Sequence, residues 1–302
     1  MNYRQKYLSL VIAALLVGAA PAFAASSAPS LGAASDFAVL SAAPNAGGAV
    51  TCTDSTITGV VGSSGPPISV TQTNCTITGG VIAPVSAGVL TAFNGAYDAL
   101  AGQSCDSFLT GTLADATLTP GVYCFAAAAT LTGTLTLSGG SNDTWLFKIG
   151  TSGTGALTGT NFSVVMANGA SACNVTWWVA EAATMTRGAF NGVILAGAAI
   201  TLSGTEHTAG TPPVETFNGQ ALATAAVTLT DVAFLGCEAG GRGGKSQSKC
   251  NQGVGNGPEN CDPGNSNQDG HSSNPFFSGS PRTNDELGGT PGAPGRMGGN
   301  TQ

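Results

Sequence analysis

The feature of this sequence that most constrains its fold is a short sequence pattern that occurs three times between Cys173 and Phe234. Each copy consists of a short apolar strand, a corner of small residues, and a second strand in which aliphatic residues alternate with threonine. The copies begin at Trp177, Val193 and Gln220, and the tripeptide Phe-Asn-Gly precedes the last two. A unit this short cannot bury its own apolar side chains, so we expect the copies to stack on one another.

The same kind of alternation occurs before the repeats. Residues 51–78 and 130–166 alternate threonine with isoleucine, valine or leucine between turns of Gly, Ser and Pro, which is typical of β-strands. Leu31 to Leu40 predicts the first strand. An extended strand over Thr130 to Leu137 would place its four threonines on one side and its apolar residues on the other. We therefore expect a mainly β body.

One helix is predicted, from Ser86 to Gln103. Its apolar positions fall at spacings of three and four, as in an amphipathic helix: Val89, Leu90, Phe93, Tyr97 and Leu100. Ser86 is placed to cap its start and Gly102 to end it. A lone helix among strands is expected to lie along one side of the stack and cover apolar surface there.

The N-terminus has the composition of a processing signal. Arg4 and Lys6 precede an apolar run from Leu8 to Ala20, and an Ala-Phe-Ala sequence ending at Ala24 follows. We expect residues 1–24 to be a signal peptide, and the mature chain to be secreted or held at the cell surface. No later stretch is long and apolar enough to predict a membrane-spanning helix.

Eight cysteines in an exported chain predict disulfides. Their spacing suggests four pairs: Cys52–Cys75, Cys105–Cys124, Cys250–Cys261 and, bracketing the repeats, Cys173–Cys237. Sequence alone leaves this connectivity open. The alternative is a metal site, but the chain has no paired C-x-x-C and only two histidines, so we expect no metal and no cofactor.

Composition changes at the end of the repeats, which divides the mature chain into a β body over residues 25–236 and a tail over 237–302. Gly, Asn, Pro and Ser dominate the tail, and it has almost no aliphatic residues. Such a segment cannot offset its ordering entropy by burial, so we expect disorder apart from the cysteine clip. A calcium loop beginning at Asp262 is disfavoured because the bidentate glutamate is absent.

Charge and residue types argue against two classes of function. The body holds two basic side chains, Lys148 and Arg187, against ten acidic ones, which is too few cations for nucleic acid. His207 lies in an insertion and His271 in the tail, and neither has the context of a catalytic triad. Five carboxylates near predicted strand ends show no period that would gather two in a cleft: Asp143, Glu181, Glu206, Glu215 and Asp231.

The remaining candidate for a functional site is an uncharged outer surface of the stacked strands. Stacking the repeats would place uncharged outward residues side by side on one face: Thr158, Thr160, Thr184, Thr186, Ala199, Thr201, Ala226, Thr228 and Thr230. An exposed sheet normally carries Lys, Glu and Arg to stay soluble. A rigid grid of methyl and hydroxyl groups is suited to ordered water, because methyls cage water while hydroxyls anchor it. The alternative is that threonine is simply a good strand residue on a wet face.

Several motifs occur in the order found in a known family. They are Leu31 to Leu40, Leu118 to Tyr123, Leu131 to Leu137, Asn168 to Val175 with Trp177 and Val179, and Gly219 to Leu229. Together they resemble the microbial ice-binding protein family of the DUF3494 type. The resemblance covers Leu31 to Gly236, nearly the whole predicted body.

This resemblance implies a right-handed, discontinuous β-helix of triangular section with one long α-helix packed alongside. It also implies a secreted, non-enzymatic antifreeze protein that adsorbs to ice through one flat face, and we expect a monomer. The chain departs from simple members in its eight cysteines, its insertion from Glu206 to Glu215 and its tail. Two alternatives stay open: an adhesin or matrix protein whose tail docks to an envelope partner, and a polysaccharide-active β-helix.

Overall fold

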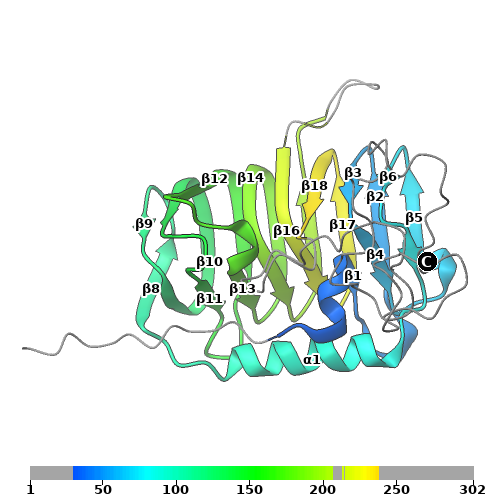
Figure 1. Ribbon diagram of the computed structural model, residues 1–302, viewed down its shortest axis with the longest axis horizontal. Coiled ribbons are helices and arrows are strands. Elements are labelled where there is room, and N and C mark those ends of the chain that lie inside the picture. The colour runs from blue at the N-terminus through cyan, green and yellow to red at the C-terminus, as the bar shows by residue number, and fades with distance from the viewer. Residues whose placement is uncertain (1–29, 207–212, 214, 238–302) are drawn as a thin grey trace, which may run out of the picture.

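The computed structural model describes residues 30–206, 213 and 215–237 (Figure 1). The predicted signal peptide, the tail beyond Cys237 with its Cys250–Cys261 clip, His207 and His271 lie outside these residues. Within them the protein is mainly β, and every strand pair is parallel. The strands form three ladders, each running along the long axis of the molecule. No helix in the described part of the chain is long and apolar enough to cross a membrane.

The first ladder carries the helix. Its strands, in spatial order, are the start of β8 (Ser107–Thr112), the start of β10 (Gly121–Ser138), β11 (Trp145–Ile149), β13 (Val175–Val179), the end of β14 (Ala183–Ala196), the end of β16 (Glu215–Ala223), β1 (Phe37–Ser41), β4 (Val60–Ser63) and β7 (Val81–Ile82). The apolar halves of the three repeats pair here, with Trp177 opposite Ile194 and Ile194 opposite Ala221. The predicted stacking of the repeats is confirmed.

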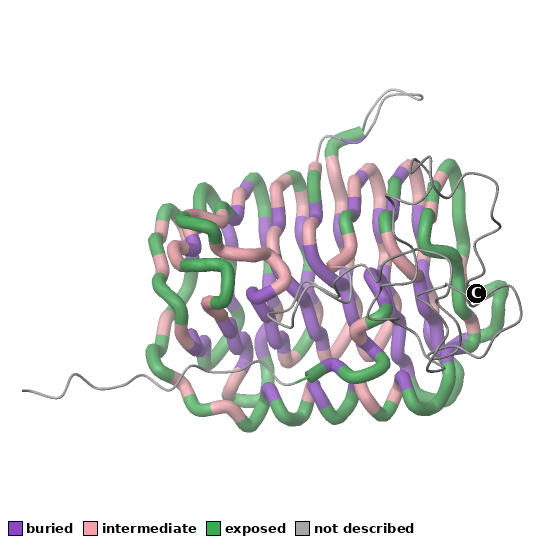
Figure 2. The backbone as a smooth tube through the Cα atoms, in the orientation of Figure 1, coloured by how far each residue is buried: buried purple, intermediate pink, exposed green. Residues whose placement is uncertain are grey.

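The second ladder holds the threonine-bearing strands and is called the threonine ladder below. It consists of the end of β8, the middle of β10, the starts of β12 (Leu157–Ala167) and β14, then β15 (Ile200–Ser203), β17 (Val227–Thr230), β2 (Val50–Thr53) and β5 (Val70–Thr73). From β10 to β2 along this ladder, inward residues are buried and alternate with half-buried or exposed ones (Figure 2), whereas β8 and β5, at the two ends, have no buried residue in it. Each strand between the ends therefore has one apolar and one solvated side.

The third ladder closes the interior. It contains β9 (Thr117–Leu118), the ends of β10 and β12, the middle of β14, the start of β16, β18 (Val232–Gly236), β3 (Thr56–Thr58) and β6 (Thr76–Ile77). The described residues also form short 3-10 turns: η1 (Gly32–Asp36) precedes β1, and η2 (Pro44–Ala46), η3 (Pro67–Ser69) and η4 (Ala172–Asn174) lie between strands. The long strands β10, β12, β14 and β16 pass from one ladder to the next.

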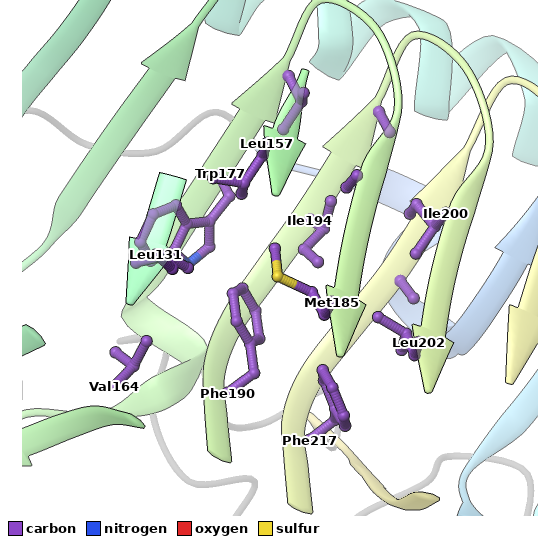
Figure 3. Close-up of a cluster of buried hydrophobic side chains, with 14 of the residues drawn as sticks. Leu131, Leu157, Val164, Trp177, Met185, Phe190, Ile194, Ile200, Leu202 and Phe217 are labelled. Carbon is purple, nitrogen blue, oxygen red and sulfur yellow. The ribbon is translucent and has the colours of Figure 1, made fainter. Parts of the chain in front are cut away.

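Side chains from all three ladders meet in one apolar core (Figure 3). Met185 and Leu202 enter it from the threonine ladder, Ile194 from the first ladder and Phe217 from the third. Trp177 stacks on Phe147 one strand away, with ring centroids 4.0 Å apart. Since a repeat alone has no second layer to pack on, burial of these side chains between stacked strands is what stabilises the ladders.

The helix α1 (Ala87–Ala101) crosses the strands of the first ladder, as predicted (Figure 1). Val89, Phe93, Ala96 and Leu100 form its buried stripe. They belong to a second apolar cluster that includes outward residues of the first ladder: Leu40, Leu146, Trp178, Leu195 and Leu222. Ser86 occupies the N-cap position, but its side chain makes no capping hydrogen bond; Gly102 is the C-cap.

The end of α1 is fixed by a buried cation. Lys148 on β11 is 4% exposed, and its Nζ donates hydrogen bonds to the carbonyl oxygens of Ala101, at 2.9 Å, and Gln103. The carbonyls of a last helical turn have no partner within the helix, and a positive charge there also favours the helix dipole. Burial lowers the pKa of the Lys148 ammonium.

Three of the four predicted disulfides lie within the described residues, and all three are formed: Cys52–Cys75, Cys105–Cys124 and Cys173–Cys237. The last joins the residue after β18 to the η4 turn. Spacing along the chain was therefore a sufficient guide to pairing here. The Cys250–Cys261 pair stays a prediction.

Two strand predictions are refined by the structure. The segment Leu31 to Leu40 does supply the first strand, but the strand begins only at Phe37, because Gly32–Asp36 forms the 3-10 turn η1. The alternation from Thr130 to Leu137 does not lie on one flat strand. Gly133 has a φ of 64°, which turns the chain, so Thr130 and Thr132 lie on the threonine ladder while Thr134 and Thr136 lie on the third.

The hydrogen bonds from Lys148 to the end of α1 predict a specific loss of stability when they are removed. Lys148→Met removes the charged donor from two carbonyls beside the helix end, and a hydrogen bond to a charged group contributes about 1.5–3 kcal/mol. We expect urea unfolding to show a free energy of unfolding lower by about this amount. Arg187→Met, which removes an exposed cation, should change it by less than about 0.5 kcal/mol. Equal losses in both variants would contradict this role for Lys148.

Candidate functional site

Threonine occupies the central outward position of eight successive strands in the threonine ladder. Their pairing is residue on residue, with no shift between neighbours: Thr112, Thr130, Thr158, Thr184, Thr201, Thr228, Thr51 and Thr71. Hydrogen-bonded strands lie about 4.8 Å apart, so this row repeats one threonine at about that interval. We call the outward side chains of this ladder the threonine face.

A second row lies two residues further along each strand. It contains Thr160, Thr186, Ser203, Thr230, Thr53 and Thr73, again paired in register. Thr132 extends it where β10 shifts register against β12, and its hydroxyl lies 3.2 Å from that of Thr112. The two rows are about 6.7 Å apart, because outward residues alternate along a strand.

Alanine forms a third row just before the strands begin. The backbone N–H groups of Ala183 and Ile200 donate to the carbonyls of Ala199 and Ala226, each at 3.0 Å. These bonds place the residues preceding the strands in the same sequence as the threonines: Ala156, Ala182, Ala199, Ala226 and Ala49. All five are half-buried. A row of methyl groups therefore borders the two rows of hydroxyls.

All nine residues predicted from sequence lie on this face. The seven threonines fall in the two threonine rows, and Ala199 and Ala226 fall in the alanine row. Sequence reasoning missed three members of the alanine row, Ala49, Ala156 and Ala182. It also missed eight members of the other two rows: Thr51, Thr53, Thr71, Thr73, Thr112, Thr130, Thr132 and Ser203. An alanine-x-threonine-x-threonine pattern would have found several of them, since it recurs at 49–53 and 128–132 as well as 156–160, 182–186 and 226–230.

Charge is confined to the border of the threonine face. None of the residues in the three rows is ionisable. At the corner after the second row the chain adopts a left-handed conformation, with φ between 46° and 64°, at Gly133, Asn161, Arg187, Asp231, Asp54 and Asn74. Gly, Asn and Asp tolerate this conformation best, which explains the polar edge. Arg187 is the one residue of another type among these six corner residues.

The five carboxylates considered from sequence lie near strand ends and corners. Three of them accept a hydrogen bond: Glu181 from the N–H of Gly155 at 2.9 Å, Glu215 from the hydroxyl of Thr205 at 2.6 Å, and Asp143 from the N–H of Gly140 at 2.8 Å. Asp231 sits at the left-handed corner, and Glu206 is exposed. No group of three or more His, Cys, Asp and Glu gathers as a metal site in residues 30–206, 213 and 215–237.

Comparison with known proteins gives a consistent result. The family model described as "Ice-binding-like" matches residues 43–234. "Ice-binding protein K3-B1" of Typhula ishikariensis is 33% identical over 218 residues, which cover 64% of this chain and 86% of that protein. The ice-binding protein of Nostoc sp. (strain HG1) is 44% identical over 112 residues, covering 36% of this chain and 40% of that protein.

Solved structures agree with the sequence comparison. The crystal structure of an ice-binding protein from an Antarctic Flavobacteriaceae bacterium is 36% identical, with a TM-score of 0.57. The match covers 68% of this chain and 46% of that one, so this chain spans less than half of that relative. An ice-binding protein from the ascomycete Antarctomyces psychrotrophicus is 29% identical, with a TM-score of 0.56 and 96% of its chain covered.

The left-handed conformation of Arg187 predicts that replacing it with glycine stabilises the protein. Arg187 has a φ of 53°, and left-handed backbone costs a non-glycine residue about 1–2 kcal/mol, part of which glycine returns as entropy in the unfolded chain. Arg187→Gly should therefore raise the free energy of unfolding by about 0.5–1 kcal/mol in urea titrations. The control Thr216→Gly, inside β16, should lower it. A loss of stability in Arg187→Gly would contradict this interpretation.

Proposed function

The chain belongs to the ice-binding-like family, and we propose that it binds ice through the threonine face. The observation that carries this proposal is the register of the three rows, which repeats alanine, threonine and threonine on successive strands with no charged residue among them. The relatives named above are ice-binding proteins, which supports ice as the ligand. The surface is extended and has the periodicity of a lattice.

The face acts by holding water in fixed positions. Threonine supplies a methyl group, around which water forms a cage, and a hydroxyl that hydrogen-bonds the cage to the protein. Because the side chains stand on hydrogen-bonded strands, their positions are set before contact, and little conformational entropy is lost on binding. Water ordered in this way merges with the ice surface. Growth then continues only between adsorbed molecules, where the curved front opposes it.

We propose that the three ladders are the sides of a right-handed β-helix of triangular section. Support comes from the all-parallel pairing, from strands such as β14 that contribute to three ladders in turn, and from α1 on one side. This β-helix would be discontinuous, because β1, β2 and β3 pair with β16, β17 and β18, which are far away in the sequence. The threonine face is then the side next to the one that α1 covers.

The predicted signal peptide and the disulfides favour a secreted or surface-held monomer. A second candidate function is suggested by residues 238–302, which follow the segment matched by the family model, 43–234. In that function the same body is displayed as an adhesin or matrix protein, and the tail docks to an envelope partner. Deleting 238–302 would release such a protein from cells, whereas unchanged cell retention would exclude this role for the tail.

The ice-binding proposal predicts loss of activity from bulk on the threonine face. Thr201→Tyr combined with Thr228→Tyr places two rings on adjacent strands, which holds the lattice away from the surface without touching the core. We expect ice shaping and recrystallisation inhibition to be lost at unchanged circular dichroism.

The matched control is Thr134→Tyr combined with Thr216→Tyr, which changes exposed threonines of the third ladder. We expect this variant to retain the activity. If the Thr201 and Thr228 variant keeps the activity of the parent protein, the threonine face is not the binding surface.

A further inference from the structure

The threonine face is assembled from two parts of the chain, which are connected through α1 and meet along a seam that none of the disulfides in the described residues crosses. Strands β1 to β7 form one part, and β8 to β18 form the other. They join along one seam, where β1, β2 and β3 pair with β16, β17 and β18. The three disulfides of the described residues each join cysteines on the same side of this seam. Both threonine rows cross it, from Thr228 to Thr51 and from Thr230 to Thr53.

Pairing at the seam has a competing register. A slip of one residue would turn every side chain to the wrong side and is excluded by the apolar core. A slip of two residues keeps the alternation of inward and outward side chains. The reason is that both segments at the seam, 49–53 and 226–230, carry alanine, threonine and threonine at every second position. The threonines would still face outward, but the rows would break at the seam. Elsewhere short connections between successive strands limit such slips; here the paired residues are more than 170 positions apart.

Ser41 fixes the first corner of the seam, between the first ladder and the threonine ladder. Its side chain is 0% exposed. The hydroxyl donates to the carbonyl of Ala225, at 2.7 Å, and accepts the N–H of Ala49, at 2.9 Å. Ala225 and Ala49 flank the two strands that carry the threonine rows, so this hydroxyl ties their starting points together.

Ser55 fixes the second corner, between the threonine ladder and the third ladder. It is 2% exposed, and its hydroxyl accepts the N–H of Val232, at 3.1 Å, across the seam. The same hydroxyl donates to the carbonyl of Thr53, at 2.7 Å, the last residue of β2. The far ends of the threonine-bearing strands are thus also tied in one register.

Gln220 fixes the third corner, between the third ladder and the first. It is 2% exposed, and its Nε2 donates to the carbonyls of Ser35, at 2.8 Å, and Phe37, at 2.7 Å. Each of the three corners therefore has one buried polar side chain that bonds to backbone on the other side. A slipped register would take away the partners across the seam at all three corners, and a buried polar group that loses a hydrogen-bond partner is unfavourable.

We propose that Ser41, Ser55 and Gln220 are positioning residues that set the register of the seam and so make the threonine face continuous. This inference rests on the proposed function for its consequence, which is ice binding, but the register itself is measurable without ice. The three side chains do not contact the ligand. They act by aligning Thr51, Thr53, Thr71 and Thr73 with the rows contributed by the rest of the chain.

The test uses the full mature chain with Ser41→Ala, Ser55→Ala and Gln220→Met, singly and combined. Ser64→Ala is the matched control: it removes a buried hydroxyl that donates to the carbonyl of Ala43 and accepts the N–H of Gly48, both on its own side of the seam. Recrystallisation inhibition is measured near 0 °C on variants that circular dichroism shows to be folded. We expect the combined variant to lose most of its activity, the single variants to lose part, and the control to keep it.

A second readout reports the register directly. Ala233 pairs with Thr56 on the third ladder, away from the threonine face. In the parent background, Ala233→Cys with Thr56→Cys should form a disulfide detectable by mass spectrometry, and Ala233→Cys with Thr58→Cys should not. In the combined variant we expect the yield of the first disulfide to fall and that of the second, which reports a two-residue slip, to rise.

The outcomes separate the two proposals. Folded seam variants with parental activity and parental crosslinking overturn the positioning role, even if their melting temperature is lower. Equal losses in Ser64→Ala overturn it as well, since any buried serine would then have the same effect. If the parent protein itself has no activity on ice, the proposed function fails, and the crosslinking yields still decide whether these residues set the register.

Discussion

The distance between hydrogen-bonded parallel strands, about 4.8 Å, sets every repeat in this molecule. It stacks Trp177 on Phe147 inside the protein, and it spaces Thr184, Thr201 and Thr228 outside. The inside and the outside are therefore not independent. Any change that disturbs packing within the core also shifts the rows of the threonine face, because both are carried by the same strands.

Corners determine how much of each strand faces one direction. Left-handed residues such as Gly133 and Asn161 end the threonine ladder and turn the chain onto the third ladder. Polar and charged side chains collect at these corners, while the rows between them stay uncharged. The protein thus keeps its charged groups at the edges of the threonine face, and the face itself presents only uncharged side chains in a regular array.

Much of this architecture could be predicted from the sequence, because local patterns encode it. The spacing from Val89 to Leu100 predicted α1, and the alternation in the repeats predicted which threonines face outward. Two features were missed for physical reasons. The alternation of threonine and leucine continues through Gly133, so periodicity gave no sign of the turn there. The local pattern at 49–53 marks Thr51 as outward, but its place next to Thr228, with Thr71 on its other side, depends on pairing between segments far apart in the sequence.

The helix has a consequence for how such a protein can change in size. Between β7 and β8 the chain returns from one end of the first ladder to the other, and α1 supplies most of that return. Its 15 residues span about 22 Å, at about 1.5 Å per residue. An added strand lengthens the stack by about 4.8 Å, which requires about three more helical residues. The length of α1 therefore limits how many strands the stack can hold, and with them the number of threonines in each row of the threonine face, although α1 lies on a different side of the stack.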